Sequence, residues 1–187
     1  MDRARRMLLG LAGVTGAGAL LHGLTRSGTV DAAGTEGGKA AGKHAGKHVF
    51  EVVKTDAQWR EALTPAQFRI LRKAGTEPPF SSPLDREKRA GTFACAGCEL
   101  PLFSSRTKFD SRTGWPSFWK PLDDAVVEDS DFTLGMKRVE VLCRRCGGHL
   151  GHVFEDGPPP TGLRYCMNGL AMTFTPGNDK APAGDAS

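Results

Sequence analysis

VLCRRCGGHLGHVFEDG, residues 141–157, joins a cysteine pair to short apolar runs that glycine and aspartate interrupt. The same pattern of short apolar runs, interrupted by glycine, proline, serine and aspartate, covers residues 80–174. Runs of this length predict strands and tight turns, and no long helical period interrupts them. We therefore expect a mainly β domain of antiparallel strands.

Two short helices are expected in front of these strands. Thr55 can cap a helix that carries Trp59 on its inner face. Thr64 followed by Pro65 is typical of the start of a second helix, which Gly75 is expected to end.

Size and charge limit the classes of protein to consider. A chain of 187 residues with 39% hydrophobic residues can bury one ordinary core, which predicts one catalytic-size domain. The formal net charge of +4 comes from basic residues scattered among nearly as many acidic ones. That pattern is typical of a solvated surface and does not favour binding to nucleic acid.

The N-terminal residues do not resemble part of this core. A basic head with paired Arg5 and Arg6 precedes an apolar run over 7–24, which is the pattern of a twin-arginine-like export signal spanning residues 1–33. A small-residue site at 30–32 predicts cleavage before Ala33 and a periplasmic or extracellular location. An uncleaved membrane anchor is the alternative, since the run is near the lower length for spanning a bilayer.

The segments that flank the domain are expected to be unstructured. Residues 34–48 are mostly glycine, alanine and lysine, which predicts a flexible linker. His44 and His48 lie in it without cysteine or carboxylate partners, so a linker is favoured over a metal site there. Residues 177–187 are expected to form a disordered tail, and the domain to span 49–176.

Four of the five cysteines form two CxxC pairs. Two such pairs can complete a tetrahedral thiolate shell, which is typical of closed structural zinc sites. The alternative is two disulfides, but a disulfide across CxxC is strained and more typical of redox catalysts. We therefore expect one structural Zn²⁺ per chain, with these ligands: Cys95, Cys98, Cys143 and Cys146.

The fifth cysteine, Cys166, lies in the strand-like segment RYCMN between Arg164 and Asn168. Strand alternation predicts these three side chains on one face, where the guanidinium would lower the thiol pKa. His149 and His152 offer acid and base groups that titrate near neutrality. A lone cysteine is commonly a buried small hydrophobe, but these polar neighbours favour a nucleophile.

Three long motifs resemble those of the methionine-R-sulfoxide reductases, the B-type enzymes that repair oxidised methionine. The resemblance covers about residues 54–174 and rests on these segments: TPAQFRILRKAGTEPPFSSPLDREKRAG, GTFACAGCELPLFSSRTKFDSRTGWPSFWKP and VLCRRCGGHLGHVFEDGPPPTGLRYCMN. It implies two antiparallel sheets in a tent-like arrangement, structural zinc on the four paired cysteines, and Cys166 as the catalytic nucleophile.

The resemblance also implies a reaction. Cys166 would attack the sulfoxide sulfur while His149 or His152 protonates the oxygen, leaving a cysteine sulfenic acid. Trp115 would form the apolar wall that receives the substrate methyl group, although a core aromatic is the alternative. The remaining polar residues of the site, Arg164 and Asn168, would stabilise the thiolate and position the substrate.

One position departs from the family pattern. Many members have a cysteine before the GW pair that attacks the sulfenic acid, whereas here Thr113 occupies that position. Regeneration would then need an external thiol acting directly on Cys166, or a partner that the sequence does not show, because the other four cysteines are assigned to zinc.

The resemblance also implies the partners of the protein. They are oxidised proteins or peptides that carry methionine-R-sulfoxide and a thiol reductant, with no nucleic acid, and a membrane only if the N-terminal segment is uncleaved. Two rival functions are a zinc-knuckle binding module without catalysis and a thiol-processing lyase on a related zinc scaffold.

Overall fold

The computed structural model describes residues 48–131 and 138–177. The predicted export signal, all of the predicted linker except His48, and all of the predicted tail except Gly177 lie outside these residues. Within the described ranges, no helix is both long and apolar enough to cross a membrane.

Two α-helices precede the strands. A short 3₁₀ helix lies between the second of them and the first strand, and others lie between strands. The helices are α1 (Asp56–Ala62), α2 (Pro65–Lys73), η1 (Pro83–Arg86), η2 (Ser105–Thr107) and η4 (Gly169–Ala171). The strands are β1 (Gly91–Cys95), β2 (Pro101–Ser104), β3 (Lys108–Phe109), β4 (Ser117–Phe118), β5 (Val126–Asp131), β6 (Arg138–Cys143), β7 (His149–Phe154), β8 (Arg164–Met167) and β9 (Met172–Pro176).

Both helices begin as predicted, each with a capping box. Thr55 caps α1 and Thr64 caps α2, and in each helix a glutamine three residues later bonds back to the cap. The predicted end of α2 is wrong by one residue. Ala74, with φ of 50°, adopts the left-handed conformation that was expected of Gly75.

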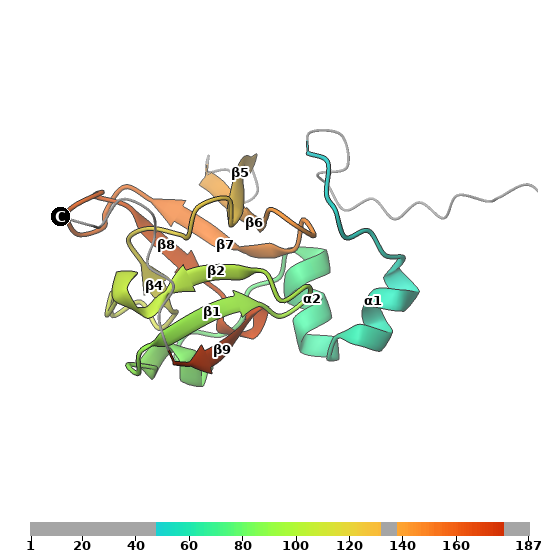
Figure 1. Cartoon of the computed structure of the whole chain (residues 1–187), viewed down its shortest axis with the longest axis horizontal. Coiled ribbons are helices and arrows are strands. Elements are labelled where there is room, and N and C mark those ends of the chain that lie inside the picture. The colour runs from blue at the N-terminus through green and yellow to red at the C-terminus, as the bar shows by residue number, and fades with distance from the viewer. Residues whose placement is uncertain (1–47, 132–137, 178–187) are drawn as a thin grey trace, which may run out of the picture. The chain divides into compact units, whose positions relative to one another are not determined.

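The strands form two antiparallel sheets, which confirms the predicted fold class (Figure 1). The smaller sheet has the order β2-β1-β9, and the larger has the order β3-β4-β8-β7-β6-β5. Every pairing between neighbouring strands is antiparallel. Helix α2 packs against β7 and η4, so the helices cover one end of the sheets.

The core lies on one face of the larger sheet, against the smaller sheet and the helices. Alternate residues of β6, β7 and β8 point into it, including the buried Val141 and Met167. Phe93 of β1 meets Phe118 of β4 edge-on at 5.0 Å between ring centroids, and Phe103 of β2 stacks on the same ring at 4.3 Å. These contacts hold the larger sheet against the smaller one.

One glycine lets β7 and β8 approach closely. A Cβ at Gly151 would lie 2.1 Å from the carbonyl oxygen of Cys166, a distance that no side chain tolerates. Gly151 pairs with Met167, and the next pair in the register is His152 with Cys166. Glycine at this position therefore holds the strand that carries Cys166 directly against the strand that carries the histidines.

Candidate active site

A row of polar side chains crosses the outer face of the larger sheet. Cys166 of β8 is directly opposite His152 of β7 on one side and Ser117 of β4 on the other. His152 is in turn opposite Glu140 of β6. Directly paired residues of antiparallel strands point to the same face, so the register places these four side chains in one line.

His149 joins this face through a β-bulge. The register between β6 and β7 shifts after Val141, so that Leu150 has no direct partner and His149 is opposite Leu142. The imidazole rings of His149 and His152 lie 5.4 Å apart between centroids, edge to face. The structure therefore brings together the two histidines and Cys166 on one face of the sheet.

A carboxylate holds each histidine. The Nδ1 atom of His149 lies 2.6 Å from Glu140 Oε1, and both side chains are almost fully buried. The Nε2 atom of His152 lies 2.9 Å from Asp131 Oδ2, which also accepts a hydrogen bond from Arg138. Burial lowers the pKa of His152, although the bond to Asp131 opposes that shift, so the neutral ring is favoured near neutral pH.

Cys166 is half-buried among polar groups. Its Sγ lies 3.9 Å from Thr113 Oγ1, so threonine contacts the thiol from the loop before β4. Burial raises the pKa of Cys166, although Thr113 and the Arg164 guanidinium each lower it. The prediction that the thiol pKa is lowered is therefore wrong in net direction, because the loss of solvation outweighs the nearby cation.

Arg164 lies two residues before Cys166 on the same face of β8. Its guanidinium donates two parallel hydrogen bonds to Asp156, at 2.8 and 2.9 Å, and lies 4.4 Å from the centre of the Phe154 ring. The bond from Arg164 lowers the pKa of Asp156. This two-point ion pair fixes the orientation of the guanidinium beside the thiol.

Asn168 has a different position from the one predicted. Strand β8 ends at Met167, and Asn168 is the first flanking residue of η4, so only Arg164 and Cys166 share a strand face. Its amide donates to the carbonyl oxygen of Leu150 at 3.0 Å and accepts from the backbone N–H of Glu77 at 2.9 Å. Asn168 thus connects the end of β8 to the bulge and to the loop after α2.

Glu77, which is not among the predicted site residues, organises the same region. Its side chain is 1% exposed, and its carboxylate accepts hydrogen bonds from the backbone N–H groups of Gly169 and Leu170 at 2.6 and 2.9 Å. A Cβ at Gly169 would lie 2.0 Å from the hydroxyl of Ser82, so only glycine fits there. The sole signal in the sequence is a glutamate placed directly before two prolines in TEPPF.

Trp115 is half-buried at the edge of the site. Its indole N–H donates to the carbonyl oxygen of Glu77 at 3.1 Å, which fixes the ring against the loop after α2. It does not belong to the main core cluster, in which Trp59 is the buried tryptophan. The indole is therefore fixed beside the loop after α2 with part of its surface exposed to solvent.

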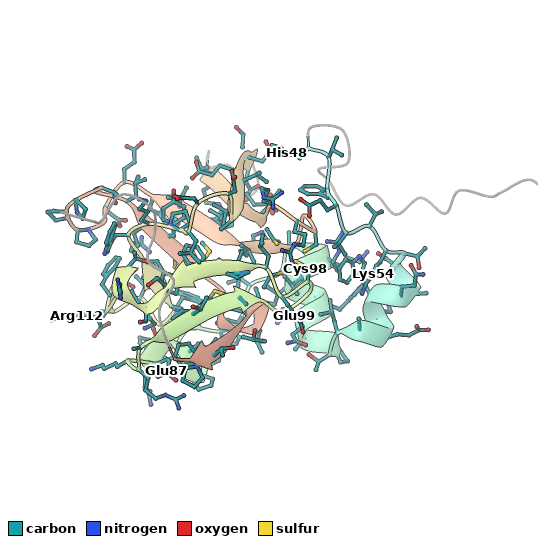
Figure 2. The ribbon with its side chains drawn as sticks, in the orientation of Figure 1. His48, Lys54, Glu87, Cys98, Glu99 and Arg112 are labelled. Atoms are coloured by element: carbon teal, nitrogen blue, oxygen red, sulfur yellow. The ribbon has the colours of Figure 1, made fainter. Side chains whose placement is uncertain are left out.

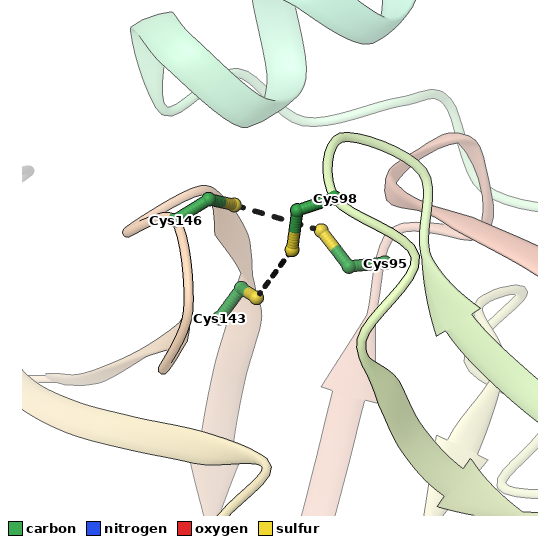
Figure 3. A group of neighbouring side chains, drawn as sticks. All are labelled: Cys95, Cys98, Cys143 and Cys146. Atoms are coloured by element: carbon green, nitrogen blue, oxygen red, sulfur yellow. Dashed lines mark hydrogen bonds between the residues drawn. The ribbon is translucent and has the colours of Figure 1, made fainter. Parts of the chain in front are cut away.

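The four paired cysteines form one cluster at the other end of β6. Their sulfur atoms all lie within 4.8 Å of one another, and the cluster is the only group of possible metal ligands found among the described residues. The Sγ atoms of Cys95 and Cys146 are 3.7 Å apart, and those of Cys98 and Cys143 are 3.5 Å apart (Figure 3). Sulfur atoms bound to a tetrahedral zinc at about 2.3 Å are about 3.8 Å apart, so the donor set fits such an ion.

The two knuckles have equivalent backbones. In each, the N–H of the residue four positions on, Glu99 or Gly147, donates to the carbonyl of the first cysteine at 2.8 Å. Both residues adopt the left-handed backbone conformation, with φ of 61° and 65°. All five cysteines are free, so the alternative of two disulfides is not present. Figure 3 shows the knuckles facing each other from the end of β1 and the end of β6.

Comparisons with known proteins agree with this architecture. Residues 63–176 match the family model described as the SelR domain. The "Peptide methionine sulfoxide reductase MsrB" of Agrobacterium fabrum is 57% identical over 127 residues, which cover 67% of this chain and 94% of that protein. Proteins of the same name from Pseudomonas putida and Thiobacillus denitrificans are 54% and 57% identical, over 96% and 94% of their lengths and 67% and 66% of this chain. The chain therefore belongs to the family of peptide methionine sulfoxide reductases MsrB, which carries the SelR domain.

Proposed function

We propose that this enzyme reduces the R epimer of peptide-bound methionine sulfoxide with Cys166 as its nucleophile. The observation that carries the proposal is the strand register that sets His152 directly opposite Cys166, with Arg164 on the same face. The comparisons favour a reductase over the rival binding module and lyase, since the relatives are named as reductases.

In the first step the Cys166 sulfur attacks the sulfoxide sulfur. The bond between sulfur and oxygen in the substrate breaks and a sulfur–oxygen bond forms at Cys166, which leaves methionine and a Cys166 sulfenic acid. One proton leaves the thiol and one proton ends on the transferred oxygen, so no net proton is consumed. His149 is suited to hold the sulfoxide oxygen. Its Nδ1 is bonded to Glu140, while its buried Nε2 has no partner among the described residues. Because a sulfoxide oxygen only accepts hydrogen bonds, Nε2 would carry a proton and donate to it while Nδ1 donates to Glu140, which would give an otherwise costly buried nitrogen a partner.

The thiol has to ionise for this attack. Because burial raises the pKa of Cys166, the resting thiol is mostly protonated at neutral pH. Arg164 and Thr113 oppose burial and stabilise the thiolate once it forms. We infer that His152 accepts the thiol proton, since its ring is neutral and is the cross-strand neighbour of the sulfur.

Trp115 completes the site in this proposal as the wall for the substrate methyl group. Its ring is fixed by the hydrogen bond to Glu77 and remains half-exposed, as a binding wall must. Asn168 positions the substrate indirectly, by holding the Glu77 loop and the bulge in place.

We also propose that the metal held by the four-cysteine cluster is structural Zn²⁺. Four thiolate donors and no open position suit a closed site, which supplies folding free energy instead of reacting. The cluster joins the end of β1 to the end of β6, so the ion would fasten the two sheets together.

The assay that tests the function uses a short peptide with one methionine sulfoxide, prepared as separate R and S epimers. With dithiothreitol as the reductant, we expect the R epimer to be converted completely and the S epimer to remain, as measured by chromatography of the peptide. Equal consumption of the two epimers would overturn the stereochemical part of the proposal. Absence of any conversion would overturn the function itself.

Regeneration of Cys166 is proposed to use external thiols. A first thiol condenses with the sulfenic acid, releasing water and forming a mixed disulfide, and a second thiol releases Cys166 and a disulfide of the reductant. Thr113 lies in contact with the sulfur but cannot form a disulfide. One equivalent of substrate should therefore leave a sulfenic acid that dimedone traps.

Thr113→Cys should supply the missing resolving thiol. Because the threonine oxygen already lies 3.9 Å from the Cys166 sulfur, a small loop movement would bring two sulfurs to the bonding distance of about 2.05 Å. We expect this variant to form a 113–166 disulfide after one turnover and to gain thioredoxin-driven activity, measured by thiol counting and peptide mapping.

Thr113→Ser is the matched control and should behave like the wild type. A wild-type disulfide between Cys166 and a cysteine of the metal cluster would contradict the division into four structural cysteines and one catalytic cysteine.

We propose that the enzyme is exported, with residues 1–33 as a twin-arginine-like signal and 34–48 as a linker. The pair Arg5 and Arg6 supports this proposal, because twin-arginine signals place two arginines directly before an apolar segment. Replacing both arginines with lysine should leave the precursor inside the cell, and mass spectrometry of the exported protein should give an N-terminus near Ala33. A cellular protein that retains Met1 would argue against export, and an uncleaved exported chain would favour the anchor.

A further inference from the structure

A cavity of about 800 Å³ lies beside the candidate active site and has no part in the chemistry described above. It is lined by Phe80, Asp85, Arg86, Glu87, Lys88, Ser105, Lys108, Phe109, Asp110 and Arg112. Two of these residues connect it to the catalytic loop. The N–H of Phe80 donates to the carbonyl oxygen of Gly114 at 2.7 Å, and Arg112 directly precedes Thr113, which contacts Cys166.

The wall between cavity and active site is closely fitted. Phe80 and Arg112 both adopt the left-handed backbone conformation, with φ of 62° and 58°. The N–H of Arg112 donates to Asp110 at 2.9 Å, and a Cβ at Gly114 would lie 2.7 Å from the backbone nitrogen of Phe80. Two uncommon conformations held by specific bonds indicate that both side chains are presented at defined positions.

Phe80 adds an apolar surface to this wall. Its ring is 58% exposed, although most large hydrophobic side chains of the domain are buried. An exposed aromatic ring beside a catalytic loop is suited to contact the backbone or side chains of a bound peptide.

Of the three acidic residues that line the cavity, Glu87 is neutralised by an ion pair and Asp110 accepts a backbone N–H. The carboxylate of Glu87 forms a two-point ion pair with Arg89, at 2.6 and 3.0 Å. Asp110 accepts the loop bond described above, and Lys108 donates to the carbonyl oxygen of Asp85 at 2.7 Å. Burial lowers the pKa of Lys108 in spite of the nearby carboxylates, so an added negative charge would be favourable there.

Three cations of the lining are exposed to solvent: Arg86, Lys88 and Arg112. Within the part of the chain that the structure describes, no hydrogen bond or ion pair involves their charged groups. Figure 2 shows Arg112 and Glu87 on the side of the domain away from α1 and α2. The cavity therefore has a surplus of positive charge beside a fixed aromatic ring.

We propose that this cavity binds an acidic side chain of the oxidised peptide, close in sequence to the methionine sulfoxide. The inference rests on the proposed function and names a preferred substrate class. An extended chain spans about 3.3 to 3.6 Å per residue, so with the sulfoxide at Cys166 the neighbouring residues two to four positions away reach past Thr113 into the cavity. Opposite charges there complement each other, and Phe80 covers the intervening chain.

The test compares isosteric peptides. One peptide series carries two aspartates two and three residues after an R-methionine sulfoxide, a second series carries them before it, and each has an asparagine counterpart. With dithiothreitol as reductant, we expect kcat/KM to be about fivefold higher for the aspartate peptide in at least one series, the size expected of a few exposed ion pairs. The preference should shrink between low salt and 0.5 M salt, because ions screen exposed charges within about 10 Å even at 0.1 M.

Charge reversal provides the second measurement. The double variant Lys88→Glu and Arg112→Glu should invert the aspartate-to-asparagine ratio, whereas Arg69→Glu, an exposed charge reversal on α2, should keep the wild-type ratio. Each ratio compares two peptides on one protein, so a partial loss of folded enzyme cancels. Melting curves identify a variant that does not fold, in which case the single variant Lys88→Glu is used.

Several outcomes would overturn the proposal. Equal kcat/KM for the aspartate and asparagine peptides of both series would do so, while turnover of all four would leave the proposed function intact. A wild-type ratio in the double variant would also overturn it. The same assay with thioredoxin as the reductant gives a further outcome: if the double variant changed only the KM for thioredoxin, the cavity would be assigned to a protein reductant and the proposal would be wrong. Turnover of none of the R peptides would instead reject the proposed function.

Discussion

Cys166→Ser should reduce kcat/KM for peptide-bound R-methionine sulfoxide by at least about a thousandfold, the scale on which loss of a nucleophile removes activity in other enzymes. Serine preserves the size of the side chain and can accept the same neighbours, but its hydroxyl is far less nucleophilic at neutral pH. The half-buried position makes the loss more complete, because burial disfavours the alkoxide even more than the thiolate.

The measurement is peptide turnover with dithiothreitol, together with metal content and a melting curve of the same preparation. Both of these should match the wild type, since Cys166 does not belong to the four-cysteine cluster. A folded, metal-bound Cys166→Ser protein that retains a tenth of the wild-type rate would refute the assignment of the nucleophile.

Cys143→Ala should remove the bound metal and lower the free energy of unfolding by at least about 3 kcal/mol, because structural zinc contributes several times that amount in small zinc domains. Wild-type protein should contain about one zinc ion per chain by elemental analysis, the number that one tetrahedral site holds. Cys143 ends β6, three residues after Glu140, so loss of the ion should also disturb the strand that holds His149.

Urea unfolding followed by circular dichroism gives the stability, and Cys166→Ala is the matched control. It removes a thiol of the same domain without touching the cluster, so it should keep its zinc. If Cys143→Ala kept the wild-type unfolding curve, or if pure wild-type protein contained no metal and melted normally, the cluster would not be a structural zinc site.

The helices, the sheets and the cysteine cluster could be predicted from the sequence because each depends on local signals. Thr55 and Thr64 carry the capping pattern of a helix start. The CxxC spacing fixes two ligands within one turn, and that turn needs no knowledge of the rest of the fold. The end of α2 was missed by one residue because Ala74, an ordinary helix former, adopts the left-handed conformation.

The supporting residues of the site could not be predicted in the same way. Asp131 and Glu140 meet the histidines only through the register of three strands, which alternation alone does not fix. Glu77 lies 91 residues from Asn168, and no periodic pattern connects them. The net pKa of Cys166 depends on how much solvent the whole fold removes, whereas the sequence displays only the neighbouring arginine.

The bulge at Leu150 has a consequence for how this site can change by mutation. Two histidines three residues apart would point to opposite faces of a regular strand, and here one extra residue brings both toward Cys166. Straightening the bulge at the present spacing, or changing the spacing by one residue while the bulge remains, would turn one ring toward the apolar core even though both histidines were still present. Point substitutions can therefore tune each histidine separately, whereas the spacing and the bulge can be inherited only together.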